Sequence, residues 1–460
     1  MSELWRVSAS EIARLVHTRT VSAREVADSA LERLDAVNPR INAIVDFRAD
    51  LVRQQADRLD KELARGNDPG PLAGVPVTVK INLDQTGFAT TDGSRLYTNR
   101  IAQTNDPAID NLLRAGAVML GRSNSPTFAI RWFTSNLLYN NPRNPRNPQL
   151  TPGGSSGGGA AAVTAGIGQI ALGTDIGGSV RYPAYACGVH GLRPSVGRVP
   201  HHNASSPEVG IGPQLMAVTG PMARRIEDLR LSLSAMSAAD PRDGVWVPAP
   251  LEGPPMPLRA ALCPRPAGMQ VAPEVAAAVQ DAGRRLADAG WTVEEIGDAP
   301  LFRGAAEVNE RLWFGFAQFA DEVQQDGDPG ALAVLAAVTP WVAKYPADAF
   351  AQALVHRATV MREWHMFLTK FAVLLVPVSG ELPFPDGLDL QGTSGFQRVW
   401  DAQFLMRALP SLGLPGLTVS TGLLGNTPVG VQIVAARFRE DLCFCAGEAI
   451  EARGTPPSSD

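Results

Sequence analysis

The chain is expected to form a single α/β domain with a mixed, mostly parallel central sheet covered by helices. From residue 72 onwards, short strand-like segments alternate with helical ones, which is typical of α/β proteins. No internal repeat and no strong linker divides the 460 residues, and a chain of this length can build one large α/β unit. We therefore expect one domain over 1–460, made of N-terminal helices (1–65), a core (72–200), a peripheral region (201–405) and a closing sheet and helix (406–452).

The first 65 residues carry helix signals. Ser8 with Glu11, and Ser22 with Glu25, each have the spacing of a capping box that opens a helix. In the second helix, apolar residues follow a helical stripe until Asn38-Pro39, which is expected to end it. These helices are interpreted as packing elements.

The core region begins with a strand in which Val75, Val77 and Val79 alternate with small residues and Lys80 stands at the end. A helix and then a strand are expected within 105–124, and the Asn-, Pro- and Arg-rich stretch 140–148 is expected to be loop. Residues 160–165 favour a helix and 169–172 a short strand.

The second half of the chain continues this alternation. The expected elements are a helix over 273–289, strands over 291–295, 371–377, 417–420 and 429–434, and a terminal helix over 440–452. The helical, aromatic-bearing stretch 301–345 is interpreted as core packing, with a substrate pocket as the alternative. The Pro-rich segments 241–257 and 377–386 are expected to be connections or lids.

Composition restricts the function classes. The formal net charge of −5 gives no reason to expect nucleic acid or a membrane as partner. The N-terminus lacks the layout of a signal peptide and the apolar runs are too short to span a bilayer, so a cytoplasmic protein is expected. The cysteines match neither a zinc site nor a dense disulfide framework, and no other cluster has ligand spacing, so we expect neither metal nor cofactor (Cys187, Cys263, Cys443, Cys445).

Residues 151–182 hold two serine-bearing glycine turns, one around Ser155 and one around Ser179. Gly177 and Gly178 permit backbone conformations that let successive N–H groups converge on one point, as in a phosphate-binding or oxyanion-binding nest. Asp175 and Arg181 flank the second turn and are expected to pair across it and fix the loop. The first turn lacks the Gly-Lys-Ser/Thr ending of a P-loop.

Only four of the 41 basic residues are lysines. Arginine cannot be deprotonated in a protein, whereas a buried lysine can lose its proton near neutral pH. Taken alone, Lys80 is an ordinary strand-end residue, but beside Ser155 and Ser179 it is a candidate base for acyl transfer that needs no histidine. None of the six histidines lies in a recognisable nucleophile or base motif, and we expect at most a minor substrate contact from the pair His201-His202.

These motifs resemble the amidase signature family of serine hydrolases. The likeness extends over nearly the whole chain and is carried by GVPVTVKIN, TPGGSSGGGAAAV, GTDIGGSVRYPA, GLRPSVGRVP and PVGVQIVA. It implies the amidase signature fold, with 72–200 as the catalytic core and the substrate pocket within 201–405. It also implies Ser179 as nucleophile, Ser155 as relay after a cis Gly154–Ser155 bond, and Lys80 as base. The implied oxyanion donors are backbone amides (Ile176, Gly177, Gly178, Ser179).

The resemblance implies hydrolysis of a small carboxylic amide through an acyl-enzyme, giving an acid and an amine or ammonia. Two alternatives stay open: a glutaminase subunit of a tRNA-dependent amidotransferase, and a non-catalytic protein whose glycine nests hold an anion. Ile81, Gly159 and Arg193 depart from the residues common in the family. The pocket is expected from segments 125–140, 301–345 and 380–405, and a homodimer is an assembly the sequence leaves open.

Overall fold

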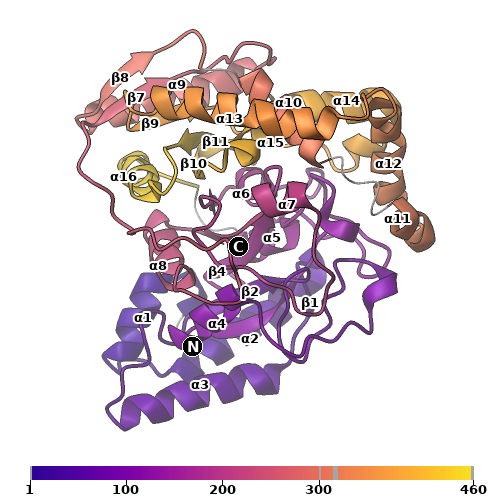
Figure 1. Cartoon of the computed structure of the whole chain (residues 1–460). Coiled ribbons are helices and arrows are strands. Elements are labelled where there is room, and N and C mark those ends of the chain that lie inside the picture. Colours follow the sequence, from indigo (N-terminus) through magenta and orange to yellow (C-terminus); the bar gives the residue numbers. More distant parts are fainter. Residues whose placement is uncertain (1–2, 300–301, 314–319, 457–460) are drawn as a thin grey trace.

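A computed structural model of the chain describes residues 3–299, 302–313 and 320–456. Its centre is one sheet of eleven strands in the order β1-β3-β2-β4-β6-β5-β10-β11-β9-β7-β8. In Figure 1 the N-terminal helices gather around the half of the sheet that holds β1 and β2, and α9, α10 and α13 lie with β7 and β9 in the other half. The expected α/β class is confirmed.

The strands are short, and five of them (β2, β3, β5, β6 and β9) are buried along their whole length. Their bounds are β1 Ile44–Asp46, β2 Pro76–Lys80, β3 Val118–Ser123, β4 Ile170–Asp175, β5 His190–Arg193, β6 Val218–Ala223, β7 Arg259–Leu262, β8 Thr292–Glu295, β9 Val373–Val376, β10 Gly416–Leu424 and β11 Thr427–Val434. The expected strands within 72–80, 105–124, 169–172, 291–295, 371–377, 417–420 and 429–434 are all present.

The sheet is mixed, but the expectation that it is mostly parallel is wrong. Within the described chain, four neighbouring pairs are parallel and six are antiparallel. Part of the reason lies between β10 and β11, where a two-residue Gly425-Asn426 turn, with Gly425 at φ 60°, makes a hairpin. Strands joined by so short a turn can only run antiparallel.

Helices surround the sheet. Their bounds are α1 Ala9–His17, α2 Ala23–Ile41, α3 Ala49–Ala64, α4 Pro107–Arg114, α5 Gly157–Thr164, α6 Arg181–Cys187, α7 Ile211–Met216, α8 Ile226–Met236, α9 Pro273–Asp288, α10 Phe302–Trp313, α11 Ala320–Asp326, α12 Pro329–Val342, α13 Ala349–Phe367, α14 Gly392–Ala402, α15 Phe404–Leu412 and α16 Glu440–Glu451. Within the described part of 301–345, α10, α11 and α12 confirm the expected helical character, and Phe314, Phe316 and Phe319 lie outside the described residues.

The two predicted capping boxes differ in outcome. Ser22 and Glu25 form the complete reciprocal pair at the start of α2. At the start of α1, the Ser8 hydroxyl accepts a hydrogen bond from the Glu11 amide. The Glu11 carboxylate accepts hydrogen bonds from Arg14 and does not bind the Ser8 amide. Thus only half of the first capping box forms.

Helix α2 does not stop at Asn38-Pro39. It runs through Pro39 to Ile41 and ends at Asn42, which adopts a left-handed conformation at φ 49°. A proline lacks an N–H, and its ring crowds a carbonyl of the preceding turn, but Pro39 lies in the last turn of α2, where little helix follows it. Burial of Ile41 in the core stabilises that turn.

The largest group of buried apolar side chains joins α1, α2 and α5 to the sheet. All four cysteines are unpaired. Among the helices described, none combines the length and the apolar character needed to cross a bilayer. The core therefore fixes the strand ends from which the candidate site is built.

Candidate active site

The candidate site lies at the edge of the sheet where β2 and β4 end. These strands are parallel neighbours, with Val79 opposite Leu172. Because the carboxyl ends of parallel neighbours meet at the same edge, Lys80, the last residue of β2, lies beside the end of β4. The sequence-based position of Lys80 at a strand end is confirmed.

The Lys80 side chain is completely buried and makes two polar contacts. Its Nζ lies 2.6 Å from Ser155 Oγ and donates to Thr174 Oγ1 at 2.9 Å. The Thr174 hydroxyl also accepts a bond from Asn82 Nδ2 at 3.1 Å. No motif in the sequence marks Thr174, and its place in the GTDIGGS block is the only signal for it.

The first serine turn is shaped by backbone geometry. Gly153 has φ 80°, and the Gly154–Ser155 peptide bond is cis, as the resemblance implies. A side chain at Gly154 would collide with the backbone of residues 131–133. The Ser156 amide donates to the Ser179 carbonyl at 3.1 Å, so the two serine turns are tied directly to each other.

The second turn holds Ser179, which is 6% exposed. Gly178 has φ 100°, a conformation that favours glycine. Its N–H donates to Asp175 Oδ1 at 2.9 Å, whereas the N–H groups of Gly177 and Ser179 donate to no group in the described parts of the chain. Ile176 follows β4 directly, and its carbonyl accepts a bond from Asn309 at 3.4 Å. Helix α6 starts two residues after Ser179, so Ser179 itself does not open a helix.

The predicted pair of Asp175 and Arg181 is present and fully buried. Arg181 approaches the carboxylate through Nε at 3.0 Å and Nη2 at 2.9 Å, and Arg193 adds Nη1 at 3.3 Å. Burial by itself would raise the pKa of Asp175, but attraction by Arg181 and its hydrogen bonds, followed by Arg193, hold that pKa well below its usual range. This ionised carboxylate fixes the Ser179 turn through the amides of Gly178 and Val180.

We expect Asp175→Asn to lower the free energy of unfolding by about 3–5 kcal/mol, because it leaves two buried guanidinium groups without a counter-charge. Urea denaturation measures the change. The matched control is Asp281→Asn, which removes ion pairs with Arg284 and Arg285 on the surface of α9, and is expected to cost at most about 1 kcal/mol. Equal losses in both variants would contradict the role given to Asp175.

The environment of Lys80 favours its neutral form. Burial lowers its pKa to about 7, although the negative charges of Asp92 and Asp175 act in the opposite direction. Asp92 comes from the loop after β2. Its amide donates to the Ile81 carbonyl, and its Oδ1 is buried with no hydrogen-bond partner among the described residues. Burial raises the pKa of Asp92, and the negative charge of Glu322 raises it further. The positive charges of Lys80 and Arg100 act in the opposite direction. Asp92 is a feature of the site that the motifs did not reveal.

We expect Asp92→Asn to move the acid limb of the kcat/KM profile to lower pH, on the order of one unit. A carboxylate near Lys80 favours the ammonium form, so removing its charge lets Lys80 lose its proton at lower pH. The profile is measured against one amide substrate from pH 5 to 9. An unchanged limb, or a shift to higher pH, would contradict this assignment.

The histidines do not reach the serine turns through any hydrogen bond in the described residues. His201 Nδ1 lies 2.7 Å from Asp106 Oδ2, and the His202 amide donates to the same oxygen. Asp106 also caps α4. The pair His201-His202 therefore stabilises a loop. No cluster that would hold a metal ion is found in the part of the chain that is described.

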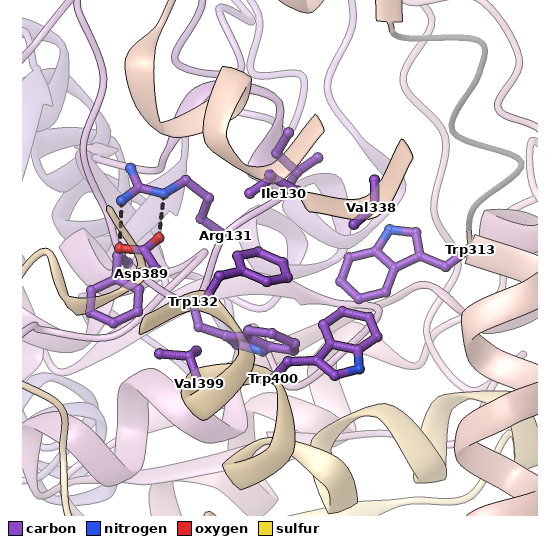
Figure 2. A pocket seen from close by; sticks show the side chains of 11 residues that line it. Ile130, Arg131, Trp132, Trp313, Val338, Asp389, Val399 and Trp400 are labelled. Atoms are coloured by element: carbon purple, nitrogen blue, oxygen red, sulfur yellow. Dashed lines mark hydrogen bonds and ion pairs between the residues drawn. The ribbon is translucent and has the colours of Figure 1, made fainter. Parts of the chain in front are cut away.

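A narrow, mainly apolar pocket is lined in part by Trp132, whose indole also contacts the second serine turn. It draws on the three segments expected from the sequence, and Figure 2 shows its aromatic side chains facing one another. Trp132 Nε1 donates to the Gly177 carbonyl at 2.8 Å, and a side chain at Gly177 would meet the Trp313 indole. The lining residues are Ile130, Arg131, Trp132, Phe133, Trp313, Val334, Val338, Asp389, Phe396, Val399 and Trp400.

Nearly the whole chain, and not only its site, resembles a known protein family. The model of the family described as Amidase matches residues 25–444. The chain belongs to the amidase signature family. It is an amidase, and the resemblance inferred from its motifs is confirmed.

The relatives of this amidase include a hydrolase, an amidotransferase subunit and an acylamidase. It is 37% identical to an indoleacetamide hydrolase of Bradyrhizobium diazoefficiens, over 98% of this chain and 87% of the relative. It is 31% identical to a subunit of the glutamyl-tRNA(Gln) amidotransferase of Carboxydothermus hydrogenoformans, over 98% and 97%. A solved bacterial aryl acylamidase superposes with a TM-score of 0.85 at 25% identity, over 97% and 96%.

Proposed function

We propose that this amidase hydrolyses a small carboxylic amide with an aromatic acyl group, through an acyl-enzyme on Ser179. The observation that carries the proposal is the position of the aromatic cavity. Its wall segment 131–133 packs against Gly154 of the first serine turn, and Trp132 binds the Gly177 carbonyl of the second. In this proposal, a ring held there would direct the attached carbonyl carbon towards the two turns.

In the proposed first step, Ser155 takes the proton of Ser179 while neutral Lys80 takes the proton of Ser155. The Lys80 Nζ to Ser155 Oγ distance of 2.6 Å supports this transfer. Ser179 Oγ bonds to the carbonyl carbon, and the oxygen becomes an oxyanion. The amides of Ile176, Gly177 and Ser179 are its proposed donors; that of Gly178 is engaged by Asp175. One such donor typically stabilises the transition state by about 3–4 kcal/mol.

The tetrahedral intermediate then breaks its C–N bond. Ser155 gives a proton to the leaving nitrogen and regains one from the Lys80 ammonium, so the amine or ammonia leaves neutral and Lys80 is neutral again. Water attacks the remaining ester by the same relay, and the carboxylic acid is released with Ser179 restored.

The lining of the cavity favours a flat ring. Trp132 meets Trp313 at 83° and Trp400 at 60°, with ring centroids 6.3 and 5.7 Å apart. Aromatic walls of this kind favour an offset or edge-on aromatic guest. The names of the indoleacetamide hydrolase and the aryl acylamidase also indicate aromatic amides.

The glutaminase alternative has support from the amidotransferase subunits among the relatives. Free glutamine carries an ammonium and a carboxylate, which need charged partners in a binding site. The only charged residues lining the cavity, within the described residues, are Arg131 and Asp389, and they neutralise each other at 2.8 Å. The cavity therefore favours an uncharged aromatic group over glutamine.

A substrate panel tests the proposal. We expect kcat/KM for an arylacetamide to exceed that for acetamide by about 100-fold or more, because burying an aromatic ring contributes about 3 kcal/mol. Acetanilide, with its ring on the nitrogen, is expected to be slower than the arylacetamide, and glutamine to be inert. Faster turnover of glutamine or acetamide would contradict the proposed substrate class.

We also propose that the reaction takes place in the cytoplasm and without a nucleic acid partner. The unpaired cysteines and the negative net charge support this placement.

A further inference from the structure

One ion pair stands in the wall of the otherwise apolar cavity. Arg131 approaches Asp389 in a bidentate manner, with Nε to Oδ2 at 2.8 Å and Nη2 to Oδ1 at 3.0 Å. Figure 2 shows the pair on one side of the pocket, across from Trp313 and Trp400. Both side chains are almost fully buried, at 2% and 5% exposure.

A buried ion pair of this kind is rarely needed for stability alone. The cost of removing two charges from water often equals or exceeds their attraction, so a hydrophobic pair of similar volume would serve the packing as well. In ligand pockets, by contrast, a few placed polar groups orient an apolar guest and set specificity. The position of the pair in the cavity wall favours such a role.

On the Asp389 side of the pair, the unused hydrogen-bonding capacity is that of an acceptor. The Arg131 guanidinium gives two N–H groups to Asp389 and a third to Ser135 Oγ at 2.5 Å. Gly330 packs directly against the Nη1 atom of Arg131, so that a side chain at position 330 would collide with the guanidinium. Asp389 has about four lone-pair sites, and its carboxylate accepts only the two Arg131 bonds from the residues described.

We propose that Asp389, held in place by Arg131, determines specificity by accepting a hydrogen bond from an N–H or O–H group on the ring of the aromatic acyl group. This inference rests on the proposed function, since it assumes that the ring occupies this cavity. It narrows the substrate class to amides of donor-bearing aromatic acids. A ring without the donor still fits, but it leaves the lone pairs of Asp389 that Arg131 does not use without a hydrogen bond.

The test compares two bicyclic arylacetamides of the same shape, one with a ring N–H and the other with sulfur in that position. In the wild-type enzyme we expect kcat/KM to be about 10- to 100-fold higher for the N–H ring, since a buried acceptor left unpaired costs about 1–3 kcal/mol. A wild-type ratio within twofold of one would overturn the proposal without any variant being needed.

The double variant Arg131→Met/Asp389→Leu removes both charges together, so neither is left buried alone. We expect its ratio to fall to near one. The matched control is Asp386→Asn, a neighbouring carboxylate that does not line the cavity, and it is expected to keep the wild-type ratio. If the double variant keeps the wild-type ratio of kcat/KM values for the two rings, the role of the pair is wrong. The role is also wrong if Asp386→Asn loses the ratio to the same extent as the double variant.

The two proposals fail in different ways. If both ring amides are hydrolysed at equal rates, the specificity role of Asp389 is wrong while the aromatic substrate class stands. If neither is hydrolysed faster than acetamide, the substrate class itself is wrong.

Discussion

Replacing Ser179 with alanine is expected to lower kcat by about 10⁴-fold or more, to the level left by substrate binding alone. The reason is chemical: without the hydroxyl no acyl-enzyme forms, and the neighbouring Ser155 lies against Lys80 at the far side of the relay. Hydrolysis of the best amide from the substrate panel measures the loss.

The matched control is Ser156→Ala, in the first serine turn. Ser156 is bound to the Ser179 turn through its backbone amide, which the substitution keeps. We expect less than about tenfold loss, because no proton transfer passes through its hydroxyl. A fluorophosphonate should label the wild type and Ser156→Ala but not Ser179→Ala. Labelling of the Ser179 variant, or failure to label folded wild type, would overturn the nucleophile assignment.

Replacing Lys80 with arginine is expected to lower kcat/KM by about 10²–10⁴-fold, the range of general-base catalysis. An arginine keeps the positive charge but cannot give up its proton near neutral pH, so it cannot accept one from Ser155. The matched control is Lys61→Arg, an exposed position in α3, which should leave the rate unchanged. More than one-tenth of wild-type activity in Lys80→Arg would contradict the assignment.

Because arginine is larger and position 80 is fully buried, Lys80→Met provides a second variant of similar length without the nitrogen. The wild-type pH profile gives an independent check. With the Lys80 pKa lowered to about 7, the neutral base increases as pH rises. The kcat/KM value should therefore increase through about pH 7 and level off above it. A flat profile from pH 5 to 9 would be inconsistent with a titrating base.

The fold was predictable where local signals agree with tertiary packing. The strand ending at Lys80 has a simple alternating pattern, and Pro273–Asp288 has a continuous apolar stripe, so both were found from the sequence. The direction of the strands was harder to predict, since six of ten neighbouring pairs in the described sheet are antiparallel. Pairing joins strands far apart in the chain, such as β5 and β10, and no local pattern records which neighbours they have.

The candidate site shows the same division. Lys80, Ser155 and Ser179 stand out in the sequence because glycine turns and a rare lysine are local features. Asp92 and Thr174 do not stand out, since their importance comes only from lying near the Lys80 amino group. Likewise, nothing near Asp389 in the sequence indicates a partner 258 positions away at Arg131.

The sequence by itself determined the family, the α/β class and the residue types available for catalysis, because short motifs and local periodicity carry that information. Only the tertiary structure decided how the basicity of Lys80 is set, which amides of the Ser179 turn remain free, and what lines the pocket. Each of these depends on burial and on charges brought together from distant parts of the chain. Desolvation of Lys80 and the pairing of Arg131 with Asp389 arise only when the sheet and its covering helices exclude water.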